Sequence, residues 1–364
     1  MTIEPPITDP AAVLQACFDD LTANRTPETI LRRLRAIESL IKEPALRAEL
    51  LHVRAIATVR LGFSTESLGD LQEAVRILEH TNNSADRSQI FRTIALVHSW
   101  RGDCLESAMA LLRSVAEANA AQNSGQLILA LIEGARLHIE MGRTRDAQAL
   151  LSSALCSADV GVPILERQRA WVNLLQVRVA SGQLIAARTQ LGDLSIILDE
   201  SPSRLRMLAL IEWARILRLS NELEKAEDVL QQASDLAPQE LDSFEQIEIA
   251  HARAELLLSQ GDLSAAASQV EKVVTRYATD DLAGREVVAR FLQAQIFDGL
   301  GRAEQAERTL AAALRRALAR GLSGYVDEAR SRIAARGAAQ GVWRVGEAPS
   351  VTPATKREAR LAKS

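Results

Sequence analysis

Apolar residues along this chain recur at the three- and four-residue intervals of amphipathic helices, and short turns separate the apolar segments. The pattern predicts helices over, for example, residues 164–180, 203–219 and 223–236, and it predicts no strand. The turns come at a spacing of 40 residues, with a single spacing of 39. Their central residues are Gly62, Gly102, Gly142, Gly182, Asn221, Gly261 and Gly301. Asparagine also tolerates the left-handed backbone that ends a helix, so the one exception preserves the turn chemistry.

Three further positions keep the same register in every unit. Seven residues before the turn lie Ala55, Ala95, Ala135, Leu175, Ala214, Ala254 and Ala294. Five residues after it lie Ser67, Ser107, Ala147, Ala187, Ala226, Ala266 and Ala306, and nine after it lie Leu71, Leu111, Leu151, Leu191, Leu230, Val270 and Leu310. Small residues let two helices approach closely, and the larger aliphatic residue one turn later fills the seam between them. Each unit is therefore predicted to be a pair of packed helices.

These offsets resemble the tetratricopeptide repeat, as in Ala254, Gly261, Ala266 and Val270. The resemblance covers residues 45–320, with a period of 40 residues instead of the usual 34 and with aliphatic residues at most aromatic positions of the motif. It implies an all-α fold, a right-handed α-solenoid (superhelix) of antiparallel helix pairs. About seven to eight repeats and a capping helix are expected.

The pattern divides the chain into three parts. Residues 1–9 are expected to be a disordered N-terminus, and residues 10–336 a helical repeat domain. Within that domain we expect a degenerate first pair at 10–42, seven repeats at 45–319 and a closing helix at 322–336. Residues 337–364 are expected to be a flexible basic tail, because the sequence from Ala338 onward contains five basic and two acidic residues.

Composition narrows the functional classes. The net charge is −4, from 43 basic and 47 acidic residues, which indicates neither nucleic acid nor a membrane surface as a partner. The three cysteines are widely separated, which argues against a disulfide or zinc framework and is typical of a reducing compartment. The N-terminus lacks signal-peptide features and no apolar run approaches 18 residues, so a cytoplasmic location is expected.

Motifs for catalysis are missing from the sequence. There is no phosphate-binding Gly-Lys-Ser/Thr motif, no dinucleotide fingerprint after a predicted strand and no HExxH or Cys/His metal spacing. His98 and His138 occupy equivalent positions in adjacent repeats, where a metal or pH site is one interpretation and packing within the helix pair is the favoured one. We therefore expect no enzyme, no catalytic residue, no cofactor and no metal.

Candidate binding residues come from the inner face of the predicted superhelix, which the first helix of each pair should line. The tetratricopeptide resemblance implies that residues three, six and ten before each turn face this groove. The polar or aromatic ones chosen as candidates are Arg92, Arg136, Gln176, Arg215, Arg218, His251, Glu255, Phe291, Gln295 and Asp298. The arginines could bind carboxylates or phosphates, while the last repeats are more acidic, so a peptide with separated charges would suit the groove. The alternative is a hydrated groove whose charged residues pair across repeats.

A second resemblance concerns the C-terminal part. Residues 319–328 and the tail at 351–361 are similar to the end of the sensor superhelix and the start of the DNA-binding domain in large LuxR-type transcription regulators of the maltose-activator (MalT-like) kind. The match at 351–361 is short, and the chain ends before a recognition helix. The resemblance implies a sensor module that binds a small effector or a protein, and DNA binding by this chain alone is not expected.

Two functional hypotheses therefore stand. The first is a regulatory binding module for a peptide, protein or small effector, connected to transcription. The second is a general protein–protein interaction scaffold without a small-molecule ligand. Polar residues on the inner face favour the first hypothesis, and the aliphatic residues between them favour the second. The identity of the ligand and the oligomeric state are left open.

Overall fold

The computed structural model describes residues 9–22, 26–61, 63–81, 83–156, 162–198, 203–237 and 244–339. These residues form seventeen α-helices and one 3-10 helix, and they contain no strand, which confirms the all-α prediction. The first helices of the pairs are α1 (Pro10–Thr22), α3 (Pro44–Arg60), α5 (Ser84–Arg101), α7 (Ser124–Glu140), α9 (Ile164–Ala180), α11 (Ser203–Leu219), α13 (Phe244–Gln260) and α15 (Ala283–Gly299).

The second helices complete each pair, and α17 (Ser323–Ala339) follows the last pair. They are α2 (Pro27–Ile37), α4 (Ser64–Leu78), α6 (Cys104–Ala120), α8 (Thr144–Cys156), α10 (Leu184–Leu198), α12 (Leu223–Leu236), α14 (Leu263–Thr279) and α16 (Ala303–Ala319), with the 3-10 helix η1 (Glu38–Leu40) after α2. Helix α17 continues three residues beyond the predicted end at 336. Residues 1–8 and 340–364, which include most of both predicted terminal segments, lie outside the described residues.

The repeat turns have the backbone conformation that the sequence requires. Gly102, Gly142, Gly182, Gly261 and Gly301 have φ between 71° and 85°. Asn221 at the one exceptional turn has φ of 61°. Both residue types reach this left-handed region at little cost, so the turn prediction is confirmed for these six turns. Gly62 lies outside the described residues.

The small positions of the repeat are the contact points within each helix pair. Six of the seven residues five positions after the turn have no exposed surface, and Ser107 is 1% exposed. Where this position holds serine, its hydroxyl donates to the carbonyl oxygen of the small residue on the first helix. Ser67 Oγ bonds Ala55 O at 2.9 Å, and Ser107 Oγ bonds Ala95 O at 2.8 Å. Serine therefore replaces alanine here without leaving a buried hydroxyl unsatisfied.

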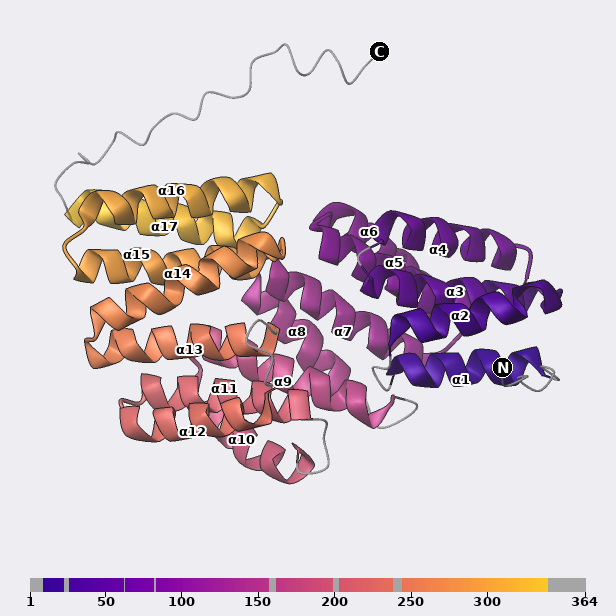
Figure 1. Ribbon diagram of the computed structural model, residues 1–364, viewed down its shortest axis with the longest axis horizontal. Helices are drawn as coiled ribbons and strands as arrows, with labels where there is room; N and C mark the ends of the chain where they lie inside the picture. The colour runs from indigo at the N-terminus through magenta and orange to yellow at the C-terminus, as the bar shows by residue number, and fades with distance from the viewer. Residues whose placement is uncertain are drawn as a thin grey trace, which may run out of the picture.

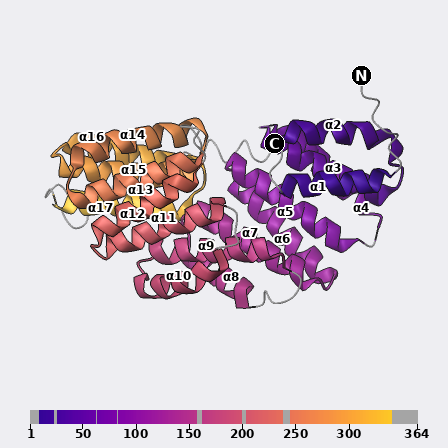
Figure 2. The same cartoon turned by 60° about the horizontal axis from the view of Figure 1, so that its bottom comes forward.

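The pairs stack into a curl with an inner and an outer layer (Figures 1 and 2). From α1 to α17, each first helix contacts the first helix of the next pair, whereas successive second helices make no comparable contact in the described residues. The first helices therefore form the inner layer and the second helices the outer one, as in a tetratricopeptide-type solenoid. None of the described helices is both long and apolar enough to cross a membrane.

The curl returns on itself, because the end of the array meets the turns of two earlier repeats (Figure 1). The Gly324 amide donates to Met141 O at 2.9 Å, and Tyr325 Oη donates to Ile139 O at 3.2 Å. Arg320 Nη1 donates to Arg101 O at 2.6 Å. All three acceptors are carbonyls at the C-terminal ends of α7 and α5, where helix carbonyls have free acceptor capacity, and Gly324 supplies an amide from the first turn of α17. We call these three bonds the closing contact.

Glycines allow the backbones to meet at the closing contact. A Cβ on Gly324 would lie 2.3 Å from Gly142 O, and a Cβ on Gly284 in α15 would lie 2.8 Å from Glu140 O. Both glycines are the second residues of their helices, and neither has a positive φ, so their absent side chains serve the long-range contact. Cys104 at the start of α6 also packs against the C-terminal hydrophobic cluster.

Candidate functional site

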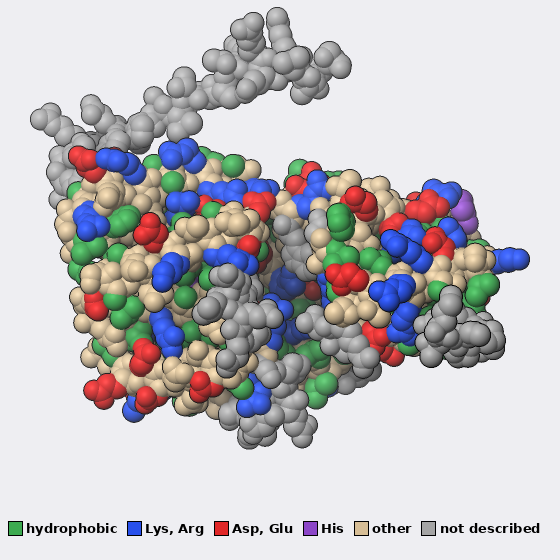
Figure 3. Space-filling view, viewed as in Figure 1, with side chains coloured by type: hydrophobic (Ala, Val, Ile, Leu, Met, Phe, Trp, Pro, Cys, Tyr) green, Lys and Arg blue, Asp and Glu red, His purple; other side chains and the backbone are tan. Residues whose placement is uncertain are grey.

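The inner side of the curl is hollowed between the C-terminal and N-terminal helices, and Lys or Arg side chains lie in the floor of the hollow (Figure 3). The ten residues predicted to line the inner face fall into three groups along this surface. Four join an ionic network in α11 and α13, three surround a small cavity near α17, and three lie on α5, α7 and α9. Their environments differ sharply, and this difference decides which of them can meet a ligand.

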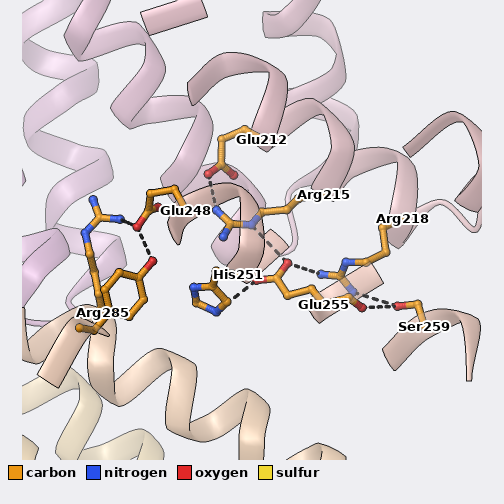
Figure 4. Close-up of polar contacts among 9 residues, drawn as sticks. Glu212, Arg215, Arg218, Glu248, His251, Glu255, Ser259 and Arg285 are labelled. Atoms are coloured by element: carbon orange, nitrogen blue, oxygen red, sulfur yellow. Dashed lines mark hydrogen bonds and ion pairs between the residues drawn. The ribbon is translucent and has the colours of Figure 1, made fainter. Parts of the chain in front are cut away.

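The first group contains Arg215 and Arg218 of α11, which bind carboxylates of the same chain (Figure 4). Arg215 Nη1 lies 2.6 Å from Glu212 Oε1, and its Nε lies 3.2 Å from Glu255 Oε2. Arg218 Nη2 is also 3.2 Å from Glu255 Oε2, and its Nη1 donates to Ser259 Oγ at 3.4 Å. Glu255 on α13 thus joins two arginines of the preceding repeat, and both guanidinium groups have a carboxylate partner within the protein, although the buried Arg218 Nε has no acceptor in the described residues.

The network continues into α15 through Glu248 of α13. The Glu248 carboxylate accepts a hydrogen bond from the Tyr277 hydroxyl and pairs with Arg285. Burial raises the pKa of Glu248, but Arg285, the Tyr277 hydroxyl and His251 together hold that pKa below its usual value. The pKa of Glu255 is lowered in the same way, because Arg215, His251 and Arg218 outweigh its burial. Both carboxylates are therefore ionised at neutral pH. Glu212 differs from them, because burial raises its pKa and Arg215 only partly opposes this effect.

His251 lies inside this network and is 4% exposed. Its Nε2 is 3.8 Å from Glu255 Oε1, and its ring makes an edge contact with Tyr277 at 5.9 Å between centroids. Burial lowers the pKa of His251, although Glu255 partly opposes the effect. The structure places this predicted groove residue between helices instead of on the open surface.

The second group is Phe291, Gln295 and Asp298 of α15, which line one cavity of about 410 Å³. Phe291 is 5% exposed and lies under the Arg332 guanidinium, 4.9 Å from the ring centroid. Arg336 of α17 pairs with Asp298. The residues of α17 thus occupy the surface that α15 presents at this end.

Residues ten positions before the turn are mostly interior, contrary to the placement assumed for His251 and Phe291. Ile132, Val172 and Ile211 are between 1% and 4% exposed. The physical reason is that consecutive first helices contact one another directly, which covers this side of each helix. Arg92 is the exception because it is only partly buried.

The third group is Arg92 on α5, Arg136 on α7 and Gln176 on α9, which are all partly buried. Arg136 Nε lies 3.5 Å from Glu133 Oε2, a loose pair within one helix. Arg92 has no carboxylate partner within the described part of the chain, and its buried Nε has no hydrogen-bond acceptor there. A buried N–H group without an acceptor costs about 1–3 kcal/mol, more when the group is charged. Arg92 is therefore the predicted site residue whose binding capacity is least used by the fold.

The neighbour of Arg92 is His52 of α3, which is 5% exposed and whose Nε2 is 2.8 Å from Thr93 Oγ1. Burial, together with the smaller effect of the Arg92 charge, lowers the pKa of His52 from 6.5 to about 3. The His52 ring is therefore neutral at physiological pH and adds no charge beside Arg92.

This arrangement predicts a pH effect on stability. The His52 ring binds a proton more weakly in the folded than in the unfolded chain. The stability that the neutral ring contributes to the fold is therefore present above pH 6.5 and is lost as the pH falls below that value. We expect the free energy of unfolding to drop by about 2 kcal/mol through His52 between about pH 7 and about pH 5. Urea unfolding followed by circular dichroism should show a smaller drop for His52→Leu and an unchanged drop for the exposed His80→Gln. Equal drops in both variants would contradict the assignment.

Two arginines that the sequence did not single out add positive charge to the N-terminal half. Arg60 at the end of α3 donates to Leu21 O at 2.9 Å, and burial lowers its pKa. The Arg169 guanidinium on α9 lowers that pKa further, although Arg169 itself pairs with Glu166 at 2.7 Å. The repeat offsets give no signal for this proximity, because Arg60 is the last residue of α3 whereas Arg169 lies in the first half of α9.

A larger cavity of about 700 Å³ lies among α2, α3 and α4. Its lining includes Leu31, Phe63 and Arg54. Arg54 Nε and Nη2 each donate to a carboxylate oxygen of Asp70 at 2.7 Å, and Arg54 Nη1 donates to Glu38 Oε1 at 3.0 Å. The central cation of this cavity is thus neutralised internally. Elsewhere in the described residues, no group of three or more His, Cys, Asp or Glu side chains is placed to hold a metal ion.

Comparison with known proteins identifies the fold. No model of a protein family matches the chain, and no curated protein matches it. Among solved structures, a Rap protein complexed with competence and sporulation factor is 14% identical, with a TM-score of 0.64 over 92% of this chain and 90% of that one. The chain has the tetratricopeptide-type solenoid fold.

Two further structures share this fold. NprR in complex with its cognate peptide NprX is 11% identical, with a TM-score of 0.59 over 90% of this chain and 99% of that one. Aspartyl phosphate phosphatase F from Bacillus subtilis is 10% identical, with a TM-score of 0.60 over 86% of this chain and 85% of that one. The resemblance to LuxR-type regulators finds no support among these proteins.

Proposed function

We propose that the chain is a non-enzymatic binding module that holds an acidic peptide segment against α5 and α7. The observation that carries the proposal is the state of Arg92, a partly buried cation whose buried Nε lacks an acceptor in the described residues. A carboxylate of a ligand would supply that acceptor and form a charge-assisted hydrogen bond.

The surroundings of Arg92 favour an anionic occupant. Arg136 in the next repeat has only the loose contact with Glu133, and Arg60 donates to a backbone carbonyl and has no carboxylate partner in the described residues. By contrast, Arg215 and Arg218 are neutralised by Glu212 and Glu255. The N-terminal half of the inner face therefore keeps unused positive charge, whereas the C-terminal half does not.

The neighbours are consistent with a peptide as the occupant, since one of them is complexed with competence and sporulation factor and another with its cognate peptide. An extended segment of a larger protein presents the same chemistry as a free peptide. The interaction-scaffold hypothesis therefore differs from this proposal only in the size of the partner. A connection to transcription has no support in the fold and is not part of the proposal.

The test compares binding of fluorescent peptide pools that are acidic, neutral or basic but otherwise matched. We expect the acidic pool to bind, with an affinity that falls as salt is added. Replacing Arg92 and Arg136 together by alanine should weaken binding by about ten-fold or more, since a hydrogen bond to a charged group is worth about 1.5–3 kcal/mol.

The matched control is Arg145→Ala on the outer helix α8, where the side chain is exposed. It removes one positive charge without touching the inner face and should leave binding unchanged. Equal binding of the basic pool, or an equal loss in Arg145→Ala, would show that the interaction is a non-specific charge effect and would sink the proposal.

A further inference from the structure

Helix α6 carries a second apolar face that the repeat does not need. Its inward residues Ala110, Leu111 and Ala118 are buried in the solenoid. On the opposite side Leu105, Met109 and Leu112 are 69%, 52% and 71% exposed. These three residues are spaced by four and three positions, so they form one stripe along the helix. We call them the α6 stripe.

The other repeats provide an internal comparison for the α6 stripe. Its residues lie three, seven and ten positions after the turn at Gly102. The equivalent outward residues are Thr65, Gly69 and Gln72 in α4; Arg145, Ala149 and Ser152 in α8; Ile185, Thr189 and Gly192 in α10; Glu224, Asp228 and Gln231 in α12; Ser264, Ser268 and Glu271 in α14; and Glu304, Arg308 and Ala311 in α16. Only α6 has large apolar residues at all three positions. The repeat architecture therefore does not explain the stripe, and an exposed patch of this kind marks an interaction surface.

The charges beside the stripe indicate its partner. Glu106 and Arg113 lie seven residues apart on the same flank of α6, and both are exposed. In the described residues neither has an ion pair, and the Arg113 guanidinium lies over the Phe91 ring, 5.7 Å from its centroid. Glu106 lies three residues before Met109 and Arg113 four residues after it, so an acid and a base on one flank complement a copy of the same helix in the reverse direction.

We propose that the α6 stripe is a self-association surface, on which a second copy of this chain docks with its α6 antiparallel. A two-fold axis near Met109 places Leu105 opposite Leu112 of the second copy, and Glu106 opposite its Arg113. The Leu105–Leu112 pair and the Glu106–Arg113 pair place the two-fold axis within one residue of each other along α6. A parallel arrangement would bring like residues together and leave Glu106 and Arg113 on opposite sides, so the pattern selects the antiparallel, isologous contact.

A contact limited mainly to one helix face is at the small end of specific interfaces, so the dimer should dissociate in the micromolar range. Sedimentation velocity of the full chain over a wide concentration range is expected to show a reversible monomer–dimer equilibrium. The double variant Leu105→Ser, Leu112→Ser should be monomeric throughout. Ile185→Ser, which changes an 87% exposed residue at the equivalent position in α10, should dimerise like the unmodified chain.

Charge exchange tests the orientation. Glu106→Arg or Arg113→Glu alone should weaken the dimer at least several-fold, and the two changes combined should restore it. All of these side chains are exposed, so circular dichroism should show unchanged folding. A chain that is monomeric at every concentration, or a double leucine variant that dimerises normally, would overturn the proposal. Failure of the combined charge variant to recover would overturn the antiparallel register.

Discussion

Gly324→Ala is expected to open the curl. Alanine is preferred to glycine within a helix by about 1 kcal/mol, so local propensity alone would make this change stabilising. In the folded chain, however, the new Cβ would lie 2.3 Å from Gly142 O. The N-terminus of α17 must then move away from α7, which breaks the bond from the Gly324 amide to Met141 O. We expect a net loss of about 1–3 kcal/mol in place of the gain, as is typical for an overpacked contact.

Small-angle X-ray scattering should show a larger radius of gyration for Gly324→Ala, and amide hydrogen exchange should rise at residue 324, whose amide loses Met141 O as its acceptor. The matched control is Gly69→Ala in α4, because no atom lies within 4 Å of the Cβ it would add. That variant should keep the shape of the protein and gain stability. A Gly324→Ala chain that is as compact as the unmodified one and at least as stable would show that the closing contact does not hold the curl.

Removing the Glu255 carboxylate is expected to have the largest effect on stability. In Glu255→Ala, Arg218 loses its carboxylate partner and Arg215 keeps only Glu212, although both arginines stay largely buried, with 21% and 14% of their side chains exposed. Breaking a buried pair from one side typically costs about 3–5 kcal/mol, because the remaining charge is uncompensated. Because Glu255 joins α11 to α13, the loss should also reduce the cooperativity of unfolding between these repeats.

The comparison is with Glu304→Ala, which breaks the pair between Glu304 and Arg308 on α16. Those side chains are 84% and 76% exposed, so solvent screens the pair and its loss should barely change the urea midpoint. If Glu255→Ala lowers the midpoint no more than Glu304→Ala does, the network is not a structural link between repeats. Arg215 and Arg218 would then return as candidates for ligand binding.

The repeat sequence predicts local structure well because the turn and the helix seam are local requirements. Positive φ at Gly102 and Asn221 follows from residue type, and burial of Ala266 and Val270 follows from their fixed offsets. Helices predicted over 164–180, 203–219 and 223–236 coincide with α9, α11 and α12. These features depend on interactions within one unit, which the sequence of that unit specifies.

The closing contact could not be predicted, because it depends on the rotation that accumulates over several repeats. Gly324 and Gly284 look like ordinary helix-weakening residues in sequence, and only the meeting of α17 and α15 with α7 explains them. Sequence inspection likewise left open whether Arg215 faces a ligand or a partner in the protein. A signal was present, since Arg215 and Glu255 occupy the same position of adjacent repeats with opposite charges. Equal offsets with opposite charge should be interpreted as a pair across repeats before they are assigned to a ligand.

The most direct test of the binding proposal is amide hydrogen exchange of the full chain with and without an acidic peptide selected from the pools. We expect protection in α5 and α7, the helices that carry Arg92 and Arg136, and unchanged exchange in the outer helices α8 and α12. Protection confined to the outer helices, or to the network helices α11 and α13 with none in α5 and α7, would contradict the assignment of the inner face of the N-terminal half as the binding surface.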